Sequence, residues 1–453
     1  MVPSDSLPSL PAEIWNSAWN MVRAQEDLKS LSLTCRLFRS ICQVLLFNEV
    51  YFSSAPPSIS LGTIPSENPT PESAESNSTY SQWEEHIKRG IQRLEGLSHH
   101  PVHRYSVKTV NFHGINNDHL YPQERVSELQ RALISSYVLA LESFTNLRSV
   151  YLGPSITIND DIGHALSSLA NLDELEMHGP CSISIASPTI EVKMLTLSEP
   201  DPPNQDVVSG LELCSARRMT SLTISDGIIH AETLLRHELA QARPEGNLLT
   251  HLVLTVEVTQ LAMVFSFLER CRNLECITLS PVSDNGDIPT LPSLRTDSMP
   301  RLASYTGPFF LARMILPGRP VSDIKILCID DFPTIGDMIY IVEMDINEDD
   351  ILRTLLQISA PVRHFRMIYL TLSGKILEFL SQRLPELQTL EVGLDIETRK
   401  MDEVLMAWDD HRLLVSLGEN GCDPTDFNLT LDNSDAGSEH TDSLKASIAY
   451  LSI

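Results

Sequence analysis

The feature that most constrains the fold is a six-residue pattern, apolar-x-x-apolar-x-apolar, that recurs along most of the chain. Its copies are LRSVYL (147–152), LDELEM (172–177), VKMLTL (192–197), MTSLTI (219–224), LTHLVL (249–254), LECITL (274–279), IKILCI (324–329), FRMIYL (365–370) and LQTLEV (387–392), with earlier copies FNEVYF (47–52) and VKTVNF (107–112) and a poorer one at 302–305. From 147 onward the copies lie about 27 residues apart on average. Alternating apolar positions within each copy predict a short, half-buried strand.

Between these strands, several segments show the apolar spacing of helices. They are 124–144, 162–170, 231–242, 260–270, 350–358 and 375–384. Pro154, Pro180, Pro200 and Pro281 come two or three residues after a predicted strand, where a missing N–H does no harm. Each period therefore predicts one strand, a turn and a helix.

This spacing and pattern resemble leucine-rich repeats. The resemblance implies an α/β fold: an irregular solenoid over residues 82–431, with parallel strands on its concave face and helices outside. Two features depart from regular repeats. The asparagine that usually satisfies the strand-end turn is missing from each copy, and the steps vary from 20 to 41 residues. An all-helical array or a doubly wound sheet remains the structural alternative.

The N-terminal segment 7–52 predicts a module of three short helices. In LPAEIWNSAWNMVR (10–23) an apolar or small residue recurs at every fourth position, with two tryptophans beside that row. A second helix is predicted from Asp27 and a third over 36–46, both with apolar stripes. These stripes carry more apolar surface than a bundle of about 40 residues can bury by itself. Part of this surface must therefore contact another domain or a partner.

At these residues the sequence resembles the F-box as it occurs in fungal proteins. The resemblance rests on LPxEI at 10–14, DLxxLSLTCRxFR at 27–39 and LLF at 45–47. It implies three helices that bind a Skp-type adaptor and, through it, a cullin-based, SCF-type ubiquitin ligase. The adaptor contact would begin at Leu10, Pro11 and Ile14. The residues that would continue it, or support it from the core of the module, are Leu28, Leu31, Cys35 and Phe38.

Two residues of the first helix depart from the family. Ala18 and Trp19 stand where aliphatic residues are usual, which could weaken or alter the adaptor interface. The alternative is a small helical cap that seals the end of the following domain. The two interpretations are compatible, because one face can cap while the other binds.

Two further segments have the composition of disordered chain. Residues 53–81 are rich in Ser, Pro, Thr and Glu, and 432–443 read DNSDAGSEHTDS. We interpret 53–81 as a disordered insertion within the first repeat; a regulatory, phosphorylatable segment is the other reading. The second is expected to be an acidic, mobile segment near the C-terminus.

Charge narrows the class of partner. The net charge of −27 argues against nucleic acid and against an anionic membrane, which both require clustered Lys and Arg. A charged contact patch on a target protein should therefore be basic. No secretory signal, membrane span or C-x-x-C pair is present in the sequence. These features predict a protein of the cytoplasm, the nucleus or both.

The sequence offers no constellation for catalysis. It lacks the common nucleophile, phosphate-loop, dinucleotide and zinc-protease motifs, so no enzyme and no cofactor is predicted. His99, His100 and His103 lack a neighbouring carboxylate or thiolate, and Cys271 and Cys276 have the wrong spacing for a zinc clip. We therefore predict no metal site.

Recognition is better supported, because an open sheet face is what a repeat array offers to a ligand. Candidate target-binding residues at outward strand positions are Tyr151, Glu174, Glu176, His251 and Glu391. The leading hypothesis is a substrate-recognition subunit of an SCF-type ubiquitin ligase, which binds its target through the repeats. The alternative is a non-catalytic interaction scaffold whose N-terminal helices only cap the solenoid.

Overall fold

The structure is a computed structural model, and it divides into two compact units. Unit 1 comprises Met1–Val192 and Pro202–Cys214, and unit 2 comprises Lys193–Asp201 and Ser215–Ile453. The described residues are 25–34, 36–53, 74–115, 123–183, 189–198, 210–224, 231–241, 247–283, 294–327, 339–340, 348–367, 380, 382–394, 414–419 and 427–432.

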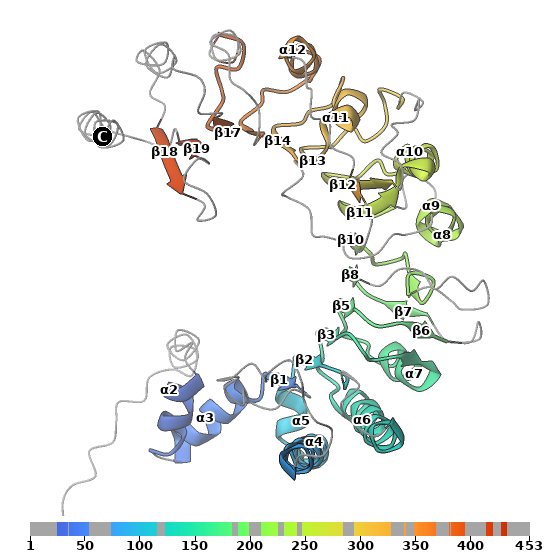
Figure 1. The fold of residues 1–453 in the computed structure, drawn as a ribbon, viewed down its shortest axis with the longest axis vertical. Helices are drawn as coiled ribbons and strands as arrows, with labels where there is room; N and C mark the ends of the chain where they lie inside the picture. The colour runs from blue at the N-terminus through green and yellow to red at the C-terminus, as the bar shows by residue number, and fades with distance from the viewer. Residues whose placement is uncertain are drawn as a thin grey trace, which may run out of the picture. The chain divides into compact units, whose positions relative to one another are not determined.

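Unit 1 is built on a parallel sheet whose strand order follows the chain. The strands are β1 (Glu49–Phe52), β2 (Thr109–Phe112), β3 (Ser149–Leu152) and β5 (Glu174–Met177). The helices are α2 (Gln25–Ser32), α3 (Arg36–Leu46), α4 (Ala74–His99), α5 (His103–Ser106), α6 (Gln123–Ser143) and α7 (Asp160–Ser167). Helices α4, α6 and α7 lie on one side of this sheet (Figure 1). A small second sheet pairs β4 (Ile158–Asn159) with β6 (Cys181–Ser182).

Unit 2 repeats the arrangement with more strands. Its parallel strands are β8 (Met194–Leu197), β10 (Ser221–Ile224), β11 (His251–Glu257), β12 (Cys276–Ser283), β13 (Ser304–Gly307), β14 (Asp323–Ile326), β16 (His364–Met367) and β17 (Thr389–Leu394). Its helices include α8 (Ala231–Arg236), α9 (Glu238–Gln241), α10 (Leu261–Leu268), α11 (Phe309–Ile315) and α12 (Glu348–Leu356). Three antiparallel strands are added: β19 (Phe427–Asp432) beside β17, β18 (Leu414–Glu419) beside β19, and β15 (Ile339–Tyr340) beside β12.

Burial alternates along the four-residue strands of both units as the sequence pattern requires. In unit 1, Val110, Val150 and Leu175 are partners in register and are all buried, as are Phe112 and Leu152. The residues between them point to the opposite face of the sheet. Burying each of these aliphatic side chains contributes about 1.5–3 kcal/mol. The sheet therefore has one face packed against helices and one face open to contact.

The same backbone hydrogen bond introduces successive strands in both units. One carbonyl accepts two consecutive N–H groups of the next strand in the sheet. In unit 1, the Lys108 oxygen accepts from Arg148 and Ser149, and the Arg148 oxygen accepts from Asp173 and Glu174. In unit 2, the Thr250 oxygen accepts in the same way from the N–H groups of Glu275 and Cys276. This recurrence indicates that the copies are structurally equivalent, although their spacing in sequence is uneven.

The prediction of an α/β fold with parallel strands is confirmed, and the all-helical alternative is wrong. Within each unit the parallel strands follow the order of the chain, without the reversal that a doubly wound sheet contains. Every predicted copy overlaps a strand. Two copies, however, lie three residues earlier in the chain than the pattern predicts. The paired strands at 323–326 and 364–367 belong to the frames VSDIKI (321–326) and VRHFRM (362–367). In both segments apolar residues recur three positions apart, so the six-residue pattern fits two alignments. Hydrogen-bonded pairing with the neighbouring strand determines which alignment forms.

Two segment boundaries also differ from the predictions. Helix α4 begins at Ala74, so the end of the segment 53–81, predicted as disordered, is helical. The residues of α4 before Trp83 are mostly polar, as in a loop. Composition alone therefore does not predict a helix there. Strand β19 ends at Asp432. Residues 10–23, 54–73 and 433–443 lie outside the described residues. Among those that are described, no helix combines the length and the apolar composition that a membrane span requires.

Candidate functional site

The face of the unit 1 sheet opposite its helices carries the most distinctive set of side chains. The outward strand residues are Glu49, Tyr51, Thr109, Asn111, Ser149, Tyr151, Glu174 and Glu176. Tyr51, Asn111, Tyr151 and Glu176 occupy the same register position on four adjacent strands and so form one row across the sheet. Parallel pairing in register thus brings together residues that are up to 125 positions apart in the chain.

Four rings form a continuous line along this row. The ring centroids of Tyr51 and His113 are 5.2 Å apart, those of His113 and Tyr151 are 5.1 Å apart, and those of Tyr151 and His178 are 4.9 Å apart. We call these four residues the aromatic strip. Tyr51 is 63% exposed. The strip is therefore accessible to a ligand at the Tyr51 end.

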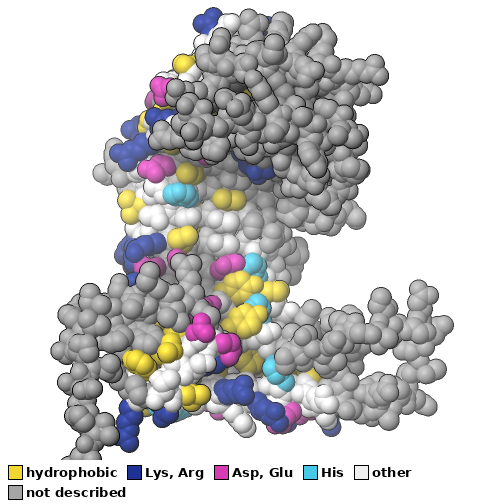
Figure 2. All heavy atoms as spheres, turned by 90° about the vertical axis from the view of Figure 1, so that its left-hand side faces the viewer, with side chains coloured by type: hydrophobic (Ala, Val, Ile, Leu, Met, Phe, Trp, Pro, Cys, Tyr) yellow, Lys and Arg dark blue, Asp and Glu magenta, His cyan; other side chains and the backbone are white. Residues whose placement is uncertain are grey.

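Carboxylates stand at both ends of the aromatic strip. His178 Nε2 lies 2.6 Å from Glu176 Oε1, within hydrogen-bond distance. At the other end, Asn111 Nδ2 donates to Glu49 Oε1 over 2.9 Å. Figure 2 shows hydrophobic, acidic and histidine side chains gathered on this face. Neighbouring polar groups thus orient the carboxylates next to the rings.

The surroundings of the strip favour the uncharged form of two of its rings. Burial lowers the pKa of His113, and the neighbouring His178 lowers it further. Burial raises the pKa of Tyr151, with Glu176 and Tyr51 adding to the effect. The site therefore offers neutral ring faces bordered by negative charge. That combination is suited to binding a cation or a hydrogen-bond donor.

Buried residues of unit 1 fix the position of His113. The backbone N–H of His113 donates to the Phe52 carbonyl over 3.2 Å. The backbone carbonyl of His113 accepts from the Tyr137 hydroxyl over 2.8 Å. Tyr137 comes from α6 and stacks on Phe112, with ring centroids 4.1 Å apart. Next to the ring, a Cβ on Gly153 would lie 2.8 Å from His113 Nδ1, closer than a side chain can come. Helix packing and a glycine thus define the middle of the strip.

Replacing Tyr137 by Phe is expected to destabilise unit 1 by about 1–2 kcal/mol, because the His113 carbonyl loses its buried donor. Denaturant unfolding followed by circular dichroism measures the effect. The matched control is Tyr105→Phe, whose exposed hydroxyl accepts only from Arg104 within helix α5. Its cost should stay below about 0.5 kcal/mol. Equal effects of the two substitutions would contradict the role given to Tyr137.

The structure brings together only some of the residues predicted to bind a target. Tyr151 and Glu176 are neighbours in the strip, and Glu174 lies on the same face beside Ser149. His251 belongs to unit 2, where its Nδ1 lies 2.9 Å from the Thr250 hydroxyl. Glu391 is on β17, and its side chain lies outside what the structure describes.

Sequence reasoning missed Tyr51, His113 and His178. The two histidines directly follow the copies 107–112 and 172–177, and Tyr51 is the equivalent of Tyr151 in the first copy. The signal was present, since comparing equivalent positions across copies aligns all three. It was hidden because the histidines lie one residue beyond the repeated pattern.

The residues predicted to contact an adaptor fall into two groups. Leu28 is buried with Cys42 in the core between α2 and α3, and Leu31 and Phe38 pack against that core at its edge. Leu10, Pro11, Ile14 and Cys35, together with Ala18 and Trp19, lie outside the described residues. Leu33, directly after α2, is 77% exposed and was not predicted as a contact.

A short junction joins α3 to the first strand. Strand β1 follows α3 almost directly and pairs with β2 over its whole length. Phe47, at this junction, packs edge-on against His103 of α5, with ring centroids 4.1 Å apart. His103 also contacts His100, at 3.8 Å between centroids. Over the described part of the chain, no group of three or more His, Cys, Asp or Glu side chains is arranged to hold a metal ion.

No model of a known protein family matches this chain, and no curated protein sequence matches it significantly.

Proposed function

We propose that this chain is the substrate-recognition subunit of an SCF-type ubiquitin ligase. In this proposal the N-terminal helices hold a Skp-type adaptor and, through it, a cullin, and the repeats hold a target protein. The observation that carries the proposal is the F-box-like string at 10–47 in the sequence; its described part includes α2 and α3, and α3 leads directly into the first strand. The chain contributes binding surfaces, and ubiquitin transfer is carried out by the other subunits.

The helical part of the proposal is supported by how α2 and α3 divide their apolar residues. Leu28 and Cys42 form the core, with Leu31, Phe38 and Leu45 around it. Leu33 is left exposed. An exposed leucine beside a small helical core gains free energy when a partner's hydrophobic groove buries it. We assign Leu33 to the adaptor interface together with Leu10, Pro11 and Ile14.

The repeat part of the proposal is an irregular leucine-rich-repeat-like solenoid. It is supported by one strand per copy, by parallel strands that pair in chain order and by helices on one side of each sheet. The recurrent hydrogen bonds from one carbonyl to two N–H groups before the strands also support it. In such an array the open sheet face is the surface available to a ligand. The aromatic strip lies on that face in unit 1.

The second candidate function is a non-catalytic scaffold whose N-terminal helices only cap the array. The contact of Phe47 with His103 favours this reading, because it shows α3 packed toward the body of unit 1. A cap needs no exposed apolar anchor, whereas an adaptor interface does. Adaptor binding therefore separates the two functions.

Co-expression of the full chain with a Skp-type adaptor should give a complex that co-purifies at micromolar concentration. The double variant Leu10→Ala/Pro11→Ala should abolish the complex while the repeats stay folded by circular dichroism. Leu33→Ala should weaken it about tenfold, the size expected for losing one apolar anchor.

The matched control is Val102→Ala, which trims another exposed aliphatic side chain of unit 1. It should leave adaptor binding unchanged. Failure of the unmodified chain to co-purify would reject the ligase function in favour of the scaffold. Binding that survives in the double variant would mean that the interface lies elsewhere.

A further inference from the structure

We propose that the open face of the unit 1 sheet binds an extended protein segment that carries arginine or lysine. The proposal deepens the function proposed above, because it names the chemical class of the target, and it rests on that function only for calling the partner a substrate. The binding face consists of the aromatic strip with Glu49, Glu174 and Glu176.

Charge on this face favours a cationic partner. Its eight outward strand residues include three glutamates and neither lysine nor arginine. The nearest basic residues in the register are Lys108 and Arg148, which stand just before β2 and β3. The chain as a whole carries −27. The glutamates of this face would repel an acidic segment. A basic segment would instead form ion pairs with these glutamates.

The rings supply a second and independent contribution. Arginine and lysine bind over tyrosine faces, with about 0.5–1 kcal/mol at exposed sites and more when water is excluded. Tyr51 is largely exposed, and Tyr151 lies next to Glu176 in the register. A guanidinium stacked on Tyr151 could therefore reach the Glu176 carboxylate. Ring and carboxylate together select a cation over a neutral polar side chain.

The spacing of the rings fits an extended peptide. Tyr51 and Tyr151 stand at one register position with Asn111 on the strand between them. Adjacent strands lie about 4.8 Å apart, so the two tyrosines are separated by about 10 Å. A segment in the extended polyproline II conformation rises about 3.1 Å per residue with about three residues per turn, so it covers this distance in about three residues and directs the side chains at i and i+3 to the same side. A segment with basic residues at i and i+3 can thus use both ring sites.

The exposed face of the unit 2 sheet has a different character. Lys325 and Arg366 are register partners on β14 and β16, with Thr306 beside Lys325 on β13. No row of rings is present there among the described residues. The acidic and aromatic face is therefore a property of the first sheet, and unit 2 provides an internal control.

The test uses the full chain and a fluorescently labelled peptide of Gly and Ser with arginine at every third position. Fluorescence anisotropy should show binding that weakens as salt rises from about 50 to about 300 mM, because salt screens exposed charges. The same peptide with glutamine in place of arginine should bind at least about tenfold more weakly. Equal binding of the two peptides would overturn the proposal.

Matched variants assign the binding to the face. Tyr151→Ala and Glu176→Gln should each weaken arginine-peptide binding about fivefold, whereas Tyr151→Phe, which keeps the ring, should bind as the unmodified chain does. The controls are Glu142→Gln on the exposed side of α6 and Tyr105→Ala on α5, which remove the same groups elsewhere in unit 1. His251→Ala serves the same purpose in unit 2. A control that weakens binding as much as Glu176→Gln would also overturn the proposal.

Adaptor co-purification of the same preparations keeps the two proposals separate. A chain that binds the adaptor but not the arginine peptide would reject the cationic partner and leave the ligase function standing. A chain that binds the peptide but not the adaptor would support the binding face and reject the ligase assignment. Both results are readable with the same folded protein.

Discussion

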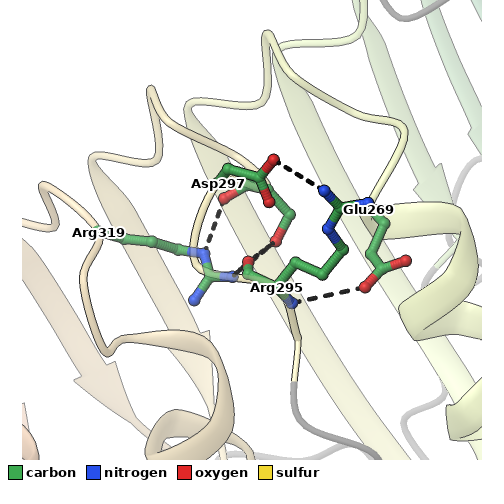
Figure 3. A network of polar contacts seen from close by, with 5 residues as sticks. Glu269, Arg295, Asp297 and Arg319 are labelled. Carbon is green, nitrogen blue, oxygen red and sulfur yellow. Dashed lines mark hydrogen bonds and ion pairs between the residues drawn. The ribbon is translucent and has the colours of Figure 1, made fainter.

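Replacing Arg319 by Leu is expected to destabilise unit 2 by about 3–5 kcal/mol, the largest effect we anticipate for a single substitution. The Arg319 side chain is only 1% exposed and lies between two segments of unit 2 (Figure 3). Its Nε donates to the Ser298 carbonyl over 3.0 Å, and its Nη2 donates to the Ser298 hydroxyl over 2.6 Å and to the Arg295 carbonyl over 2.8 Å. Its Nη1 donates to the carbonyls of Ile315 and Pro317.

The effect is large because one side chain donates hydrogen bonds to several backbone carbonyls that have no donor within a helix or strand. The Ile315 and Pro317 carbonyls come from the end of α11, where no further turn supplies an N–H. Leucine fills much of the same space but donates nothing, so several buried oxygens would lose their partner at about 1–3 kcal/mol each, with partial compensation by water. The backbone of Arg319 also joins the next repeat, since its carbonyl accepts from Ser359 over 3.0 Å. Loss of the side chain should thus loosen neighbouring repeats together.

Hydrogen exchange followed by mass spectrometry localises the effect. Amides in 294–327 and 348–367 should exchange faster in Arg319→Leu, while those in 123–183 of unit 1 should keep their rate. The control is Arg295→Leu, in the same network. Its side chain is 70% exposed and forms a surface ion pair with Asp297, so its loss should cost less than about 1 kcal/mol. Similar exchange in the two variants would show that burial of the guanidinium is not what stabilises this region.

The strands were predictable because every copy of the pattern must bury alternate residues against helices. Val150, Leu175 and Leu222 are buried, and each pairs in register with a buried residue of the adjacent strand, as the periodicity requires. The frame was not predictable at 324–329 and 365–370, where apolar residues three apart fit two alignments. Only pairing between strands distinguishes them, and that pairing is a long-range property that a single copy does not contain.

The asparagines of the array show what a search for regular repeats overlooks. The strand-end asparagine is missing, as the sequence indicates, but Asn146, Asn171 and Asn273 stand directly before the copies that begin at 147, 172 and 274. Their amides donate to the carbonyls of Tyr105, Thr145 and Asn247, each in the preceding turn of the same unit. Polar support between turns is therefore present at a different position of the repeat.

The candidate site was half predictable for a similar reason. Tyr151 and Glu176 occupy outward positions within the pattern, and alternation alone assigns them to the open face. His113 and His178 lie after the pattern, where the chain is held by the Tyr137 hydroxyl and by hydrogen bonds to Phe52 and Leu152. These contacts come from a helix and from neighbouring strands, so no local rule anticipates that the four rings form a line.

Gly179→Ala should destabilise unit 1 by about 2–3 kcal/mol, whereas the same substitution at Gly96 should stabilise it by about 0.5–1 kcal/mol. Gly179 is buried just after β5 and faces the turn that follows β3. A Cβ there would collide with the Ile156 carbonyl, which is backbone and cannot turn aside as a side chain would. Gly96 lies in the exposed part of α4, and a Cβ there meets nothing within 4 Å. Its replacement only removes the helix penalty of glycine.

Thermal and denaturant unfolding of both variants measure these opposite changes in stability. The chemical change is identical in the two variants, and only the surroundings of the glycine differ. Because Gly179 directly follows His178, the shift needed to relieve the clash should also move that ring away from Tyr151. Gly179→Ala should therefore weaken arginine-peptide binding in the fraction that remains folded, and Gly96→Ala should leave it unchanged. If both alanines raise stability, the turns after β3 and β5 do not pack as closely as the structure places them, and the line of rings that depends on this packing would not hold either.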